Sequence, residues 1–436
     1  MKRASSKEIF GWAMFDFANQ AYTLLIITVI FGDLFTRVIV GDAHSDYRLG
    51  NLLWSIALAV SYLLVVLSGP VAGAIMDFSA ARKRFLFASY VLTVVSTSLL
   101  YFVAPGYIWL GMALIVVSNF AYAIGESFIA SFLPELGPRE ELGWISGFGW
   151  ALGYVGGLVA TAFALVALGE VSEENFERIR WVGPFAAVFF LVAAIPTFLW
   201  LRERGRARRL PGLRQYVGIG FRRVRATLGD LAHYRDLTIL MVSVFFAMAG
   251  IYIIISFTFI YGAQVIQWDE KVRVWMFITV QLTAAVGALA FGFLQDRVGA
   301  RRTYVATLSL WVVAVTLIFV TPWLGRFLDF EAQYVFLVVG SVAGLCLGST
   351  QSAGRALVGV LSPRSRAAEF FGFWGLSGKL AAIVGLLGLG FLQVLFGLHL
   401  SILFCALLFG LALLAALRLD ETRGRRVAEA RESRRG

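Results

Sequence analysis

Four ionisable side chains lie inside long apolar stretches of this sequence: Asp16, Glu126, Arg355 and Lys379. An ionisable group at bilayer depth costs several kcal/mol, so each is a candidate functional residue. One interpretation is transport chemistry, because a partly desolvated carboxylate can take up and release a proton. The other is structural, with the carboxylates permanently paired to the cations and bracing one end of a helix bundle. All four residues lie toward one end of their stretches, which favours bracing, and both interpretations stay open at the sequence level.

Polar residues accompany both carboxylates at helical spacing. Asn19 and Gln20 share a helix face with Asp16, and Asn119 and Tyr122 lie on the stripe of Glu126. The sequence therefore predicts a polar pathway for a solute or an ion along these two helices.

A second group of charges belongs to a motif that occurs twice. The stretch "GFLQDRVGARR" begins at residue 292, and "GAIMDFSAARK" begins at residue 73. The matched residues are Gly73 and Gly292, Asp77 and Asp296, Arg82 and Arg301, and Lys83 and Arg302. The later copy also has Arg297 and Gly299, where the earlier copy has Phe78 and Ala80. A further echo pairs Pro138-Arg139 with Pro363-Arg364. Both repeats stand about half a chain length apart, which indicates two duplicated halves.

The elements that position these residues follow from composition. Hydrophobic residues make up 59% of 436 residues, more than a soluble domain can cover with a polar surface. Apolar runs long enough to cross roughly 30 Å of hydrocarbon recur along the chain. The predicted spans are 9–36, 50–76, 84–104, 107–131, 144–168, 181–201, 237–264, 273–295, 302–321, 333–355, 370–396 and 398–418. We therefore predict an all-α membrane protein with twelve transmembrane helices in two six-helix halves.

Charge divides the chain further. The predicted units are a first half (1–201), a basic connector (202–236), a second half (237–419) and a charged tail (420–436). Most Lys and Arg residues fall in loops on one side, which predicts cytoplasmic N- and C-termini. The net charge of +11 is thereby assigned to membrane orientation and anionic lipid, with no nucleic-acid partner. Within the connector, "LRQYVGIGFRRVRATL" is either an amphipathic helix on the inner leaflet or a solvated basic loop.

The repeated Gly-x-x-x-Asp motif resembles the signature loop of the major facilitator superfamily. The match at 292–302 is complete, and the copy at 73–83 is degenerate. The stretches "FGWAMFDFANQAY", "FLPEL" and "AEFFGFWGLSGK" are similar to the vacuole-effluxer-like branch, which includes fungal vacuolar amino-acid exporters. The resemblance implies a central cavity lined by the first, fourth, seventh and tenth spans, so that Tyr252 and Ser256 join the pathway residues. It also implies that Asp77 meets the helix start near Glu369, and Asp296 the one near Gly143, while the cytoplasmic side is closed.

These features predict a secondary transporter that moves a small solute by alternating access. An amino acid or similar zwitterion, exported from the cell, is the leading substrate by resemblance. A sugar, a drug-like amphiphile or a lysolipid is the alternative, and a non-transporting sensor on this fold is a third. No phosphate-binding loop or His/Cys cluster occurs, so we expect no enzyme activity, no metal and no cofactor. A coupling proton, a monomeric state and a bacterial inner membrane complete the expectations.

Overall fold

The predicted helical spans are present in a computed structural model, which describes residues 3–41, 48–169, 171–204, 213–229 and 233–433. Among these residues, eleven helical segments are long and apolar enough to cross a membrane, and one bent pair brings the number to twelve. This confirms the predicted all-α membrane class. The first-half helices are α1 (Ser6–Tyr22), α2 (Phe31–Leu34), α3 (Arg48–Ser79), α4 (Arg82–Ser98), α5 (Ile108–Ala130), α6 (Leu133–Leu136), α7 (Leu142–Leu168), α8 (Phe176–Ile179), α9 (Val182–Ala193) and α10 (Ile195–Trp200). The second-half helices are α12 (Arg235–Tyr261), α13 (Glu270–Val298), α14 (Ala300–Leu328), α15 (Ala332–Leu361), α16 (Ala367–Ser401) and α17 (Leu403–Leu417).

The first span is continuous but irregular. Ser5 caps α1 by accepting a hydrogen bond from the Glu8 backbone N–H, and π-helical turns at Thr23–Val29 and Phe35–Val40 flank α2. The last span is bent by 62° between Leu395–Ser401 and Leu403–Leu417, beyond Gly397, whose positive φ interrupts α16. Glycine tolerates this backbone conformation because it lacks a Cβ atom.

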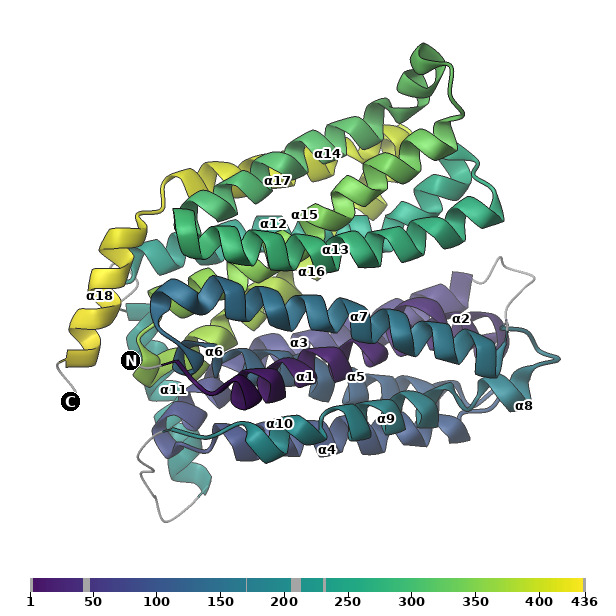
Figure 1. The fold of residues 1–436 in the computed structure, drawn as a ribbon. Coiled ribbons are helices and arrows are strands. Elements are labelled where there is room, and N and C mark those ends of the chain that lie inside the picture. The colour runs from purple at the N-terminus through teal and green to yellow at the C-terminus, as the bar shows by residue number, and fades with distance from the viewer. Residues whose placement is uncertain (1–2, 42–47, 170, 205–212, 230–232, 434–436) are drawn as a thin grey trace.

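The two halves form two helix bundles, one above the other in Figure 1. They pack against each other mainly through α7 on α13 and α3 on α16. Both described chain ends lie at one end of the bundles, since Ala4 donates to the Leu136 carbonyl and Glu432 pairs with Arg139. We call this end the terminal side and the opposite end the distal side.

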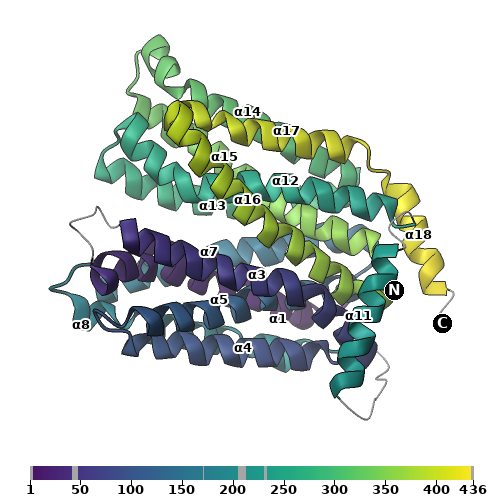
Figure 2. The ribbon, with the colours of Figure 1, turned by 180° about the vertical axis from the view of Figure 1, so that it is seen from behind.

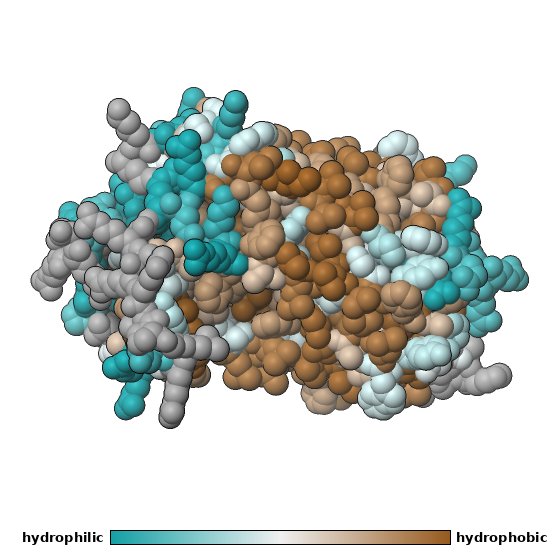
Figure 3. Space-filling model, turned by 90° about the horizontal axis from the view of Figure 1, so that it is seen from below, coloured by the Kyte–Doolittle hydropathy of each residue, from teal (hydrophilic) through white to brown (hydrophobic). Residues whose placement is uncertain are grey.

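On the face of the molecule seen in Figure 3, apolar residues form a broad belt across the middle, and hydrophilic residues lie toward both ends. Large apolar residues of the spanning segments, such as Leu67 and Phe87, are more than half exposed. Exposure of this kind indicates contact with lipid, because acyl chains replace water as the solvent there.

Two helices lie outside the bundles on the terminal side: α11 (Leu213–Gly229) in the connector and α18 (Glu421–Ser433) in the tail. In Figure 2, α11 runs across the ends of the spanning helices instead of along them. The base of α18 is tied to the second half by the Arg423–Asp236 ion pair at 2.7 Å. Its tip reaches the first half, where Glu432 accepts from Arg139 at 2.9 Å. The charged tail is thus a folded bridge between the halves.

Candidate transport site

The four ionisable residues singled out in the sequence form two ion pairs, each with one partner in either half. In the first, Arg355 on α15 donates to Asp16 on α1 at 2.7 Å. The same guanidinium donates to the hydroxyl of Ser146 at 3.1 Å and to its carbonyl at 2.9 Å. Trp12 and Trp150 lie 4.7 and 5.2 Å from the guanidinium carbon, within cation–π range. Arg355 lies before the end of α15, which extends to Leu361, beyond the predicted boundary at 355.

The glycine-rich face of α7 makes this first pair possible. A Cβ atom on Gly149 would lie 2.6 Å from the Asp16 carboxylate and 2.8 Å from the Arg355 guanidinium. Only glycine leaves the space that the ion pair occupies. Gly149 of α7 therefore makes room for the charged site.

The second ion pair joins Lys379 on α16 to Glu126 on α5 at 3.0 Å. The ammonium also donates to the Tyr252 hydroxyl at 3.2 Å, and Tyr122 donates to Glu126 at 3.0 Å. The rings of Tyr62, Tyr122 and Tyr252 lie 5.3 to 6.0 Å from the ammonium nitrogen. Lys379 is therefore held in an aromatic cage to which both halves contribute.

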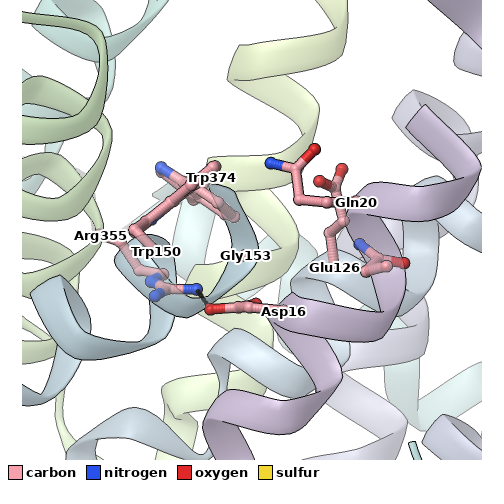
Figure 4. A pocket seen from close by; sticks show the side chains of 8 residues that line it. Asp16, Gln20, Glu126, Trp150, Gly153, Arg355 and Trp374 are labelled. Atoms are coloured by element: carbon pink, nitrogen blue, oxygen red, sulfur yellow. Dashed lines mark hydrogen bonds and ion pairs between the residues drawn. The ribbon is translucent and has the colours of Figure 1, made fainter. Parts of the chain in front are cut away.

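A small cavity of about 20 Å³ lies next to these pairs. Figure 4 shows Asp16, Gln20 and Glu126 on one side of it and Arg355, Trp150 and Trp374 on the other. Its full lining is Asp16, Asn19, Gln20, Glu126, Trp150, Gly153, Arg355 and Trp374. Three buried polar atoms of this lining have no hydrogen-bond partner in the described part of the chain: Trp150 Nε1, Trp374 Nε1 and Asn19 Oδ1. The lining residues thus carry two N–H donors and one acceptor that no described group of the protein satisfies.

The other predicted pathway residues do not line the cavity itself. Tyr122 and Lys379 bind the lining residue Glu126, and Tyr252 accepts a hydrogen bond from Lys379. Asn119 is buried and donates to Ser61 at 2.5 Å. Ser256 is exposed and lies one turn beyond Tyr252. Sequence analysis missed Trp150, Trp374 and Tyr62, although Trp374 lies in the "AEFFGFWGLSGK" motif.

The two repeated carboxylates lie at the terminal side, each at a helix start of the other half. Asp77 accepts from the backbone N–H groups of Ala368 and Glu369 at 3.2 and 2.9 Å. Asp296 accepts from those of Gly143 and Trp144 at 2.9 and 2.8 Å. These are the helix starts that the resemblance implied. A carboxylate there satisfies N–H groups without an intrahelical partner and faces the positive end of the helix dipole.

The motif glycines allow the same helices to touch. A Cβ atom on Gly73 would lie 2.1 Å from the Ala368 carbonyl oxygen, and one on Gly292 would lie 2.6 Å from that of Gly143. Real Cβ atoms do not approach oxygen so closely, so any side chain at Gly73 must separate α3 from α16.

Of the remaining motif residues, Arg82 contacts both halves. Arg82 pairs with Asp77 and with Glu135, each at 2.6 Å, and also donates to the Arg364 carbonyl across the halves. Four others contact their own half or solvent. Lys83 donates to the Leu201 carbonyl, Arg301 to the Leu417 carbonyl, Arg297 lies over the Phe293 ring, and Arg302 is exposed. Gly299 has a φ of 101° at the turn between α13 and α14.

The arginines of the second repeat, Arg139 and Arg364, form reciprocal hydrogen bonds between the halves. Arg364 donates to the carbonyls of Pro134 and Gly137 in the first half, at 3.0 and 3.5 Å. Arg139 donates to the carbonyls of Val360 and Ser362 in the second half. Each arginine thus binds carbonyls at the terminal end of a helix of the other half. With the carboxylate contacts, these bonds hold the terminal side closed.

Comparisons with known proteins agree with this architecture. The family model described as "Vacuole effluxer Atg22 like" matches residues 52–143 and 140–429. An uncharacterized MFS-type transporter of Bacillus subtilis, YxiO, is 26% identical over 392 residues, which cover 88% of each chain. Autophagy-related protein 22-1 of Neosartorya fischeri is 21% identical over 305 residues, covering 65% of this chain and 49% of that protein. The chain thus spans about half the length of this fungal relative.

Two solved structures share the fold. The proton:xylose symporter XylE aligns with a TM-score of 0.74 at 15% identity, covering 97% of this chain and 98% of that one. A bacterial homologue of the iron transporter ferroportin, in an outward-facing state, aligns with a TM-score of 0.70 at 12% identity, covering 95% and 98%.

Proposed function

Because the chain belongs to the vacuole effluxer Atg22-like family of major facilitator transporters, we propose that it exports a small zwitterion such as an amino acid by alternating access. The observation that carries this proposal is the cavity flanked by two ion pairs, each with one partner in either half. Carboxylates come from the first half and cations from the second.

This charge arrangement suits a zwitterion. A substrate carboxylate can replace Asp16 on Arg355 or Glu126 on Lys379, and a substrate ammonium can take the released carboxylate. The exchange keeps every charge paired, which matters because an unpaired charge in a buried site is costly. The two indole N–H groups and rings of Trp150 and Trp374 offer further contacts to the substrate carboxylate and side chain.

The same exchange links binding to movement. In this closed arrangement the two ion pairs help to hold the halves together, so a substrate that replaces them removes contacts between the halves. A proton on Asp16 or Glu126 would weaken the same pair, and we propose this as the coupling event.

Orientation follows from charge. The terminal side carries α11, α18 and most of the basic loops, so we propose that it faces the cytoplasm of a bacterial cell across the inner membrane. We propose that a single chain forms the transport unit, because the cavity is built from the two halves of one chain.

The test is a thermal-unfolding screen of purified protein against amino acids, sugars, drug-like amphiphiles and lysolipids. A ligand at 100 times its Kd stabilises the folded state by roughly 2.7 kcal/mol. We expect amino acids to stabilise the wild type and Asp16→Asn to abolish the shift. Asp33→Asn is the matched control, because Asp33 lies on the same span but pairs with exposed Arg37 away from the cavity.

Counterflow into proteoliposomes then measures transport of each ligand that binds. Stabilisation by a sugar or lysolipid alone would replace the zwitterion with that substrate. An amino-acid shift that survives in Asp16→Asn would remove the proposed site. Imposing a pH gradient tests coupling, and equal accumulation with and without the gradient would eliminate the proton.

A further inference from the structure

The connector helix α11 lies beside the terminal end of α3 instead of beyond it. A Cβ atom on Gly220 would lie 2.9 Å from Ile75 and 3.0 Å from Val71, so the two helices are in direct contact. Phe78 of α3 also packs edge-on against Tyr216, with ring centroids 6.4 Å apart. Because α3 is itself a spanning helix that ends at Ser79, α11 lies at the depth of its last turns.

The surface of α3 shows what surrounds α11. Leu63, Leu67, Val71 and Ile75 follow one another at four-residue spacing and form one stripe. Leu63 and Leu67 are 50% and 64% exposed, whereas Val71 and Ile75 contact α11. Along α3, the contact with α11 therefore starts where the lipid-facing stripe ends, at the edge of the hydrocarbon.

The outer surface of α11 is itself divided into two faces. Val217 and Phe221 are 38% and 60% exposed and lie next to the edge that packs on α3. Arg222 and Arg225 are exposed and lie farther around the helix. A helix in the plane of a membrane has this pattern, with apolar residues toward the acyl chains and basic residues at the headgroups.

We propose that α11 is a binding site for anionic phospholipid headgroups, with Phe221 inserted at the acyl boundary and Arg222 and Arg225 on lipid phosphates. A helix oriented across the spanning helices, at the depth of the end of α3, meets the leaflet surface along its length (Figure 2). The arginines are suited to this partner because a guanidinium binds phosphate oxygens through two parallel hydrogen bonds.

The buried edge of α11 reaches the contacts that hold the terminal side closed. Thr227 hydrogen-bonds the carboxylate of Glu369, which Arg366 also binds at 2.8 Å. The backbone N–H of Glu369 is one of the two that Asp77 accepts. The lipid-bound helix is therefore in contact with the helix start that closes the terminal side.

The first experiment locates α11 in a bilayer. Phe221→Cys and Ala226→Cys, each in a Cys346→Ala/Cys405→Ala background, are labelled with an environment-sensitive fluorophore in nanodiscs. Ala226 is the matched control, since it is also exposed but lies on another face of the same helix. We expect a doxyl-labelled lipid to quench the probe at 221 and iodide to quench the probe at 226. Equal quenching of both probes by iodide would overturn the proposal.

The second experiment tests the headgroup charge. Phosphatidylglycerol is added to detergent-solubilised full-length protein and the thermal midpoint is followed. Each basic residue at an anionic surface contributes about 1 kcal/mol. The double variant Arg222→Ala/Arg225→Ala should therefore raise about 30-fold the phosphatidylglycerol concentration that gives half of the full shift in the midpoint. Arg418→Ala/Arg426→Ala is the control, because it removes two exposed arginines from the same side of the molecule.

The outcomes decide between lipid and other sources of charge. A response that phosphatidylglycerol produces, that phosphatidylcholine and soluble glycerol phosphate do not, and that only the α11 variant loses, supports the site. Equal loss in both double variants, or an equal response to phosphatidylcholine, would overturn it.

Discussion

Replacement of Gly73 by alanine should open the terminal side. The added Cβ would lie 2.1 Å from the backbone oxygen of Ala368, about 1 Å inside the closest approach seen in proteins. A backbone carbonyl in a helix cannot turn away as a flexible side chain would. The helices α3 and α16 must therefore separate at the point where Asp77 binds the start of α16.

The size of the effect follows from the cost of overpacking. An extra methyl group in a well-packed interface costs about 1–3 kcal/mol. The cost applies to the closed terminal side, where this contact exists, and not to a state in which the helices have parted. Since 1.4 kcal/mol is a factor of ten, the ratio of open to closed molecules should rise about 5- to 140-fold.

The assay is the alkylation rate of the Ser352→Cys variant in a Cys346→Ala/Cys405→Ala background. Ser352 is buried between the halves, where its carbonyl accepts from Ser146. Gly69→Ala is the matched control, because its Cβ would lie at an ordinary 3.4 Å from the Gly372 oxygen on the same pair of helices. Equal alkylation rates in the Gly69→Ala and Gly73→Ala proteins would refute the reasoning.

Three further changes test the terminal side. Arg364→Gln should destabilise the folded protein by about 1.5–3 kcal/mol in denaturant unfolding, because the carbonyls of Pro134 and Gly137 lose a charged donor; an unchanged midpoint would contradict this. Removal of residues 421–436 deprives Arg139 of its partner on α18 and should accelerate alkylation of the Ser352→Cys variant; an unchanged rate would show that α18 does not hold the halves together. Glu203 lies outside the spans, and burial raises the pKa of its carboxyl group. The ionised form is therefore disfavoured in the folded state, so the free energy of unfolding falls as pH rises above the ordinary pKa of a glutamate. Glu203→Gln should therefore raise the thermal midpoint at pH 8 and make little difference at pH 4, and an equal effect at both values would exclude titration of this residue.

The fold could be predicted from sequence because a membrane imposes strong constraints on it. Each span must be apolar over about 20 residues, and the duplicated motif marks the two halves. The contacts of Asp77 and Asp296 with helix starts of the opposite half were predictable for a related reason. A loop motif fixes its carboxylate at one helix end, and the family resemblance supplied the partner helix.

The pairing inside the cavity was not predictable in the same way. Sequence placed Asp16, Glu126, Arg355 and Lys379 in the membrane but left open which cation meets which carboxylate, since each pair joins residues far apart in the chain. Trp150 and Trp374 were missed because aromatic residues are common throughout a membrane protein. Only the packed structure shows that their indole N–H groups lie unpaired at a cavity.

The helix α11 explains why the copy of the repeated motif at 73–83 departs from the pattern. Phe78 stands where the second copy has Arg297, which lies at the surface over Phe293. Phe78 instead packs on Tyr216 of α11, so loss of the basic residue provides an apolar seat for the connector helix. Ala80 occupies the position in the first copy that Gly299 occupies in the second, and its positive φ of 47° is disfavoured for a residue with a Cβ atom. The first copy keeps this backbone conformation despite the strain, and its Asp77 contacts Arg82 and the start of α16 together. The departure from the superfamily pattern therefore reflects an added contact with α11 and not a gate that has decayed.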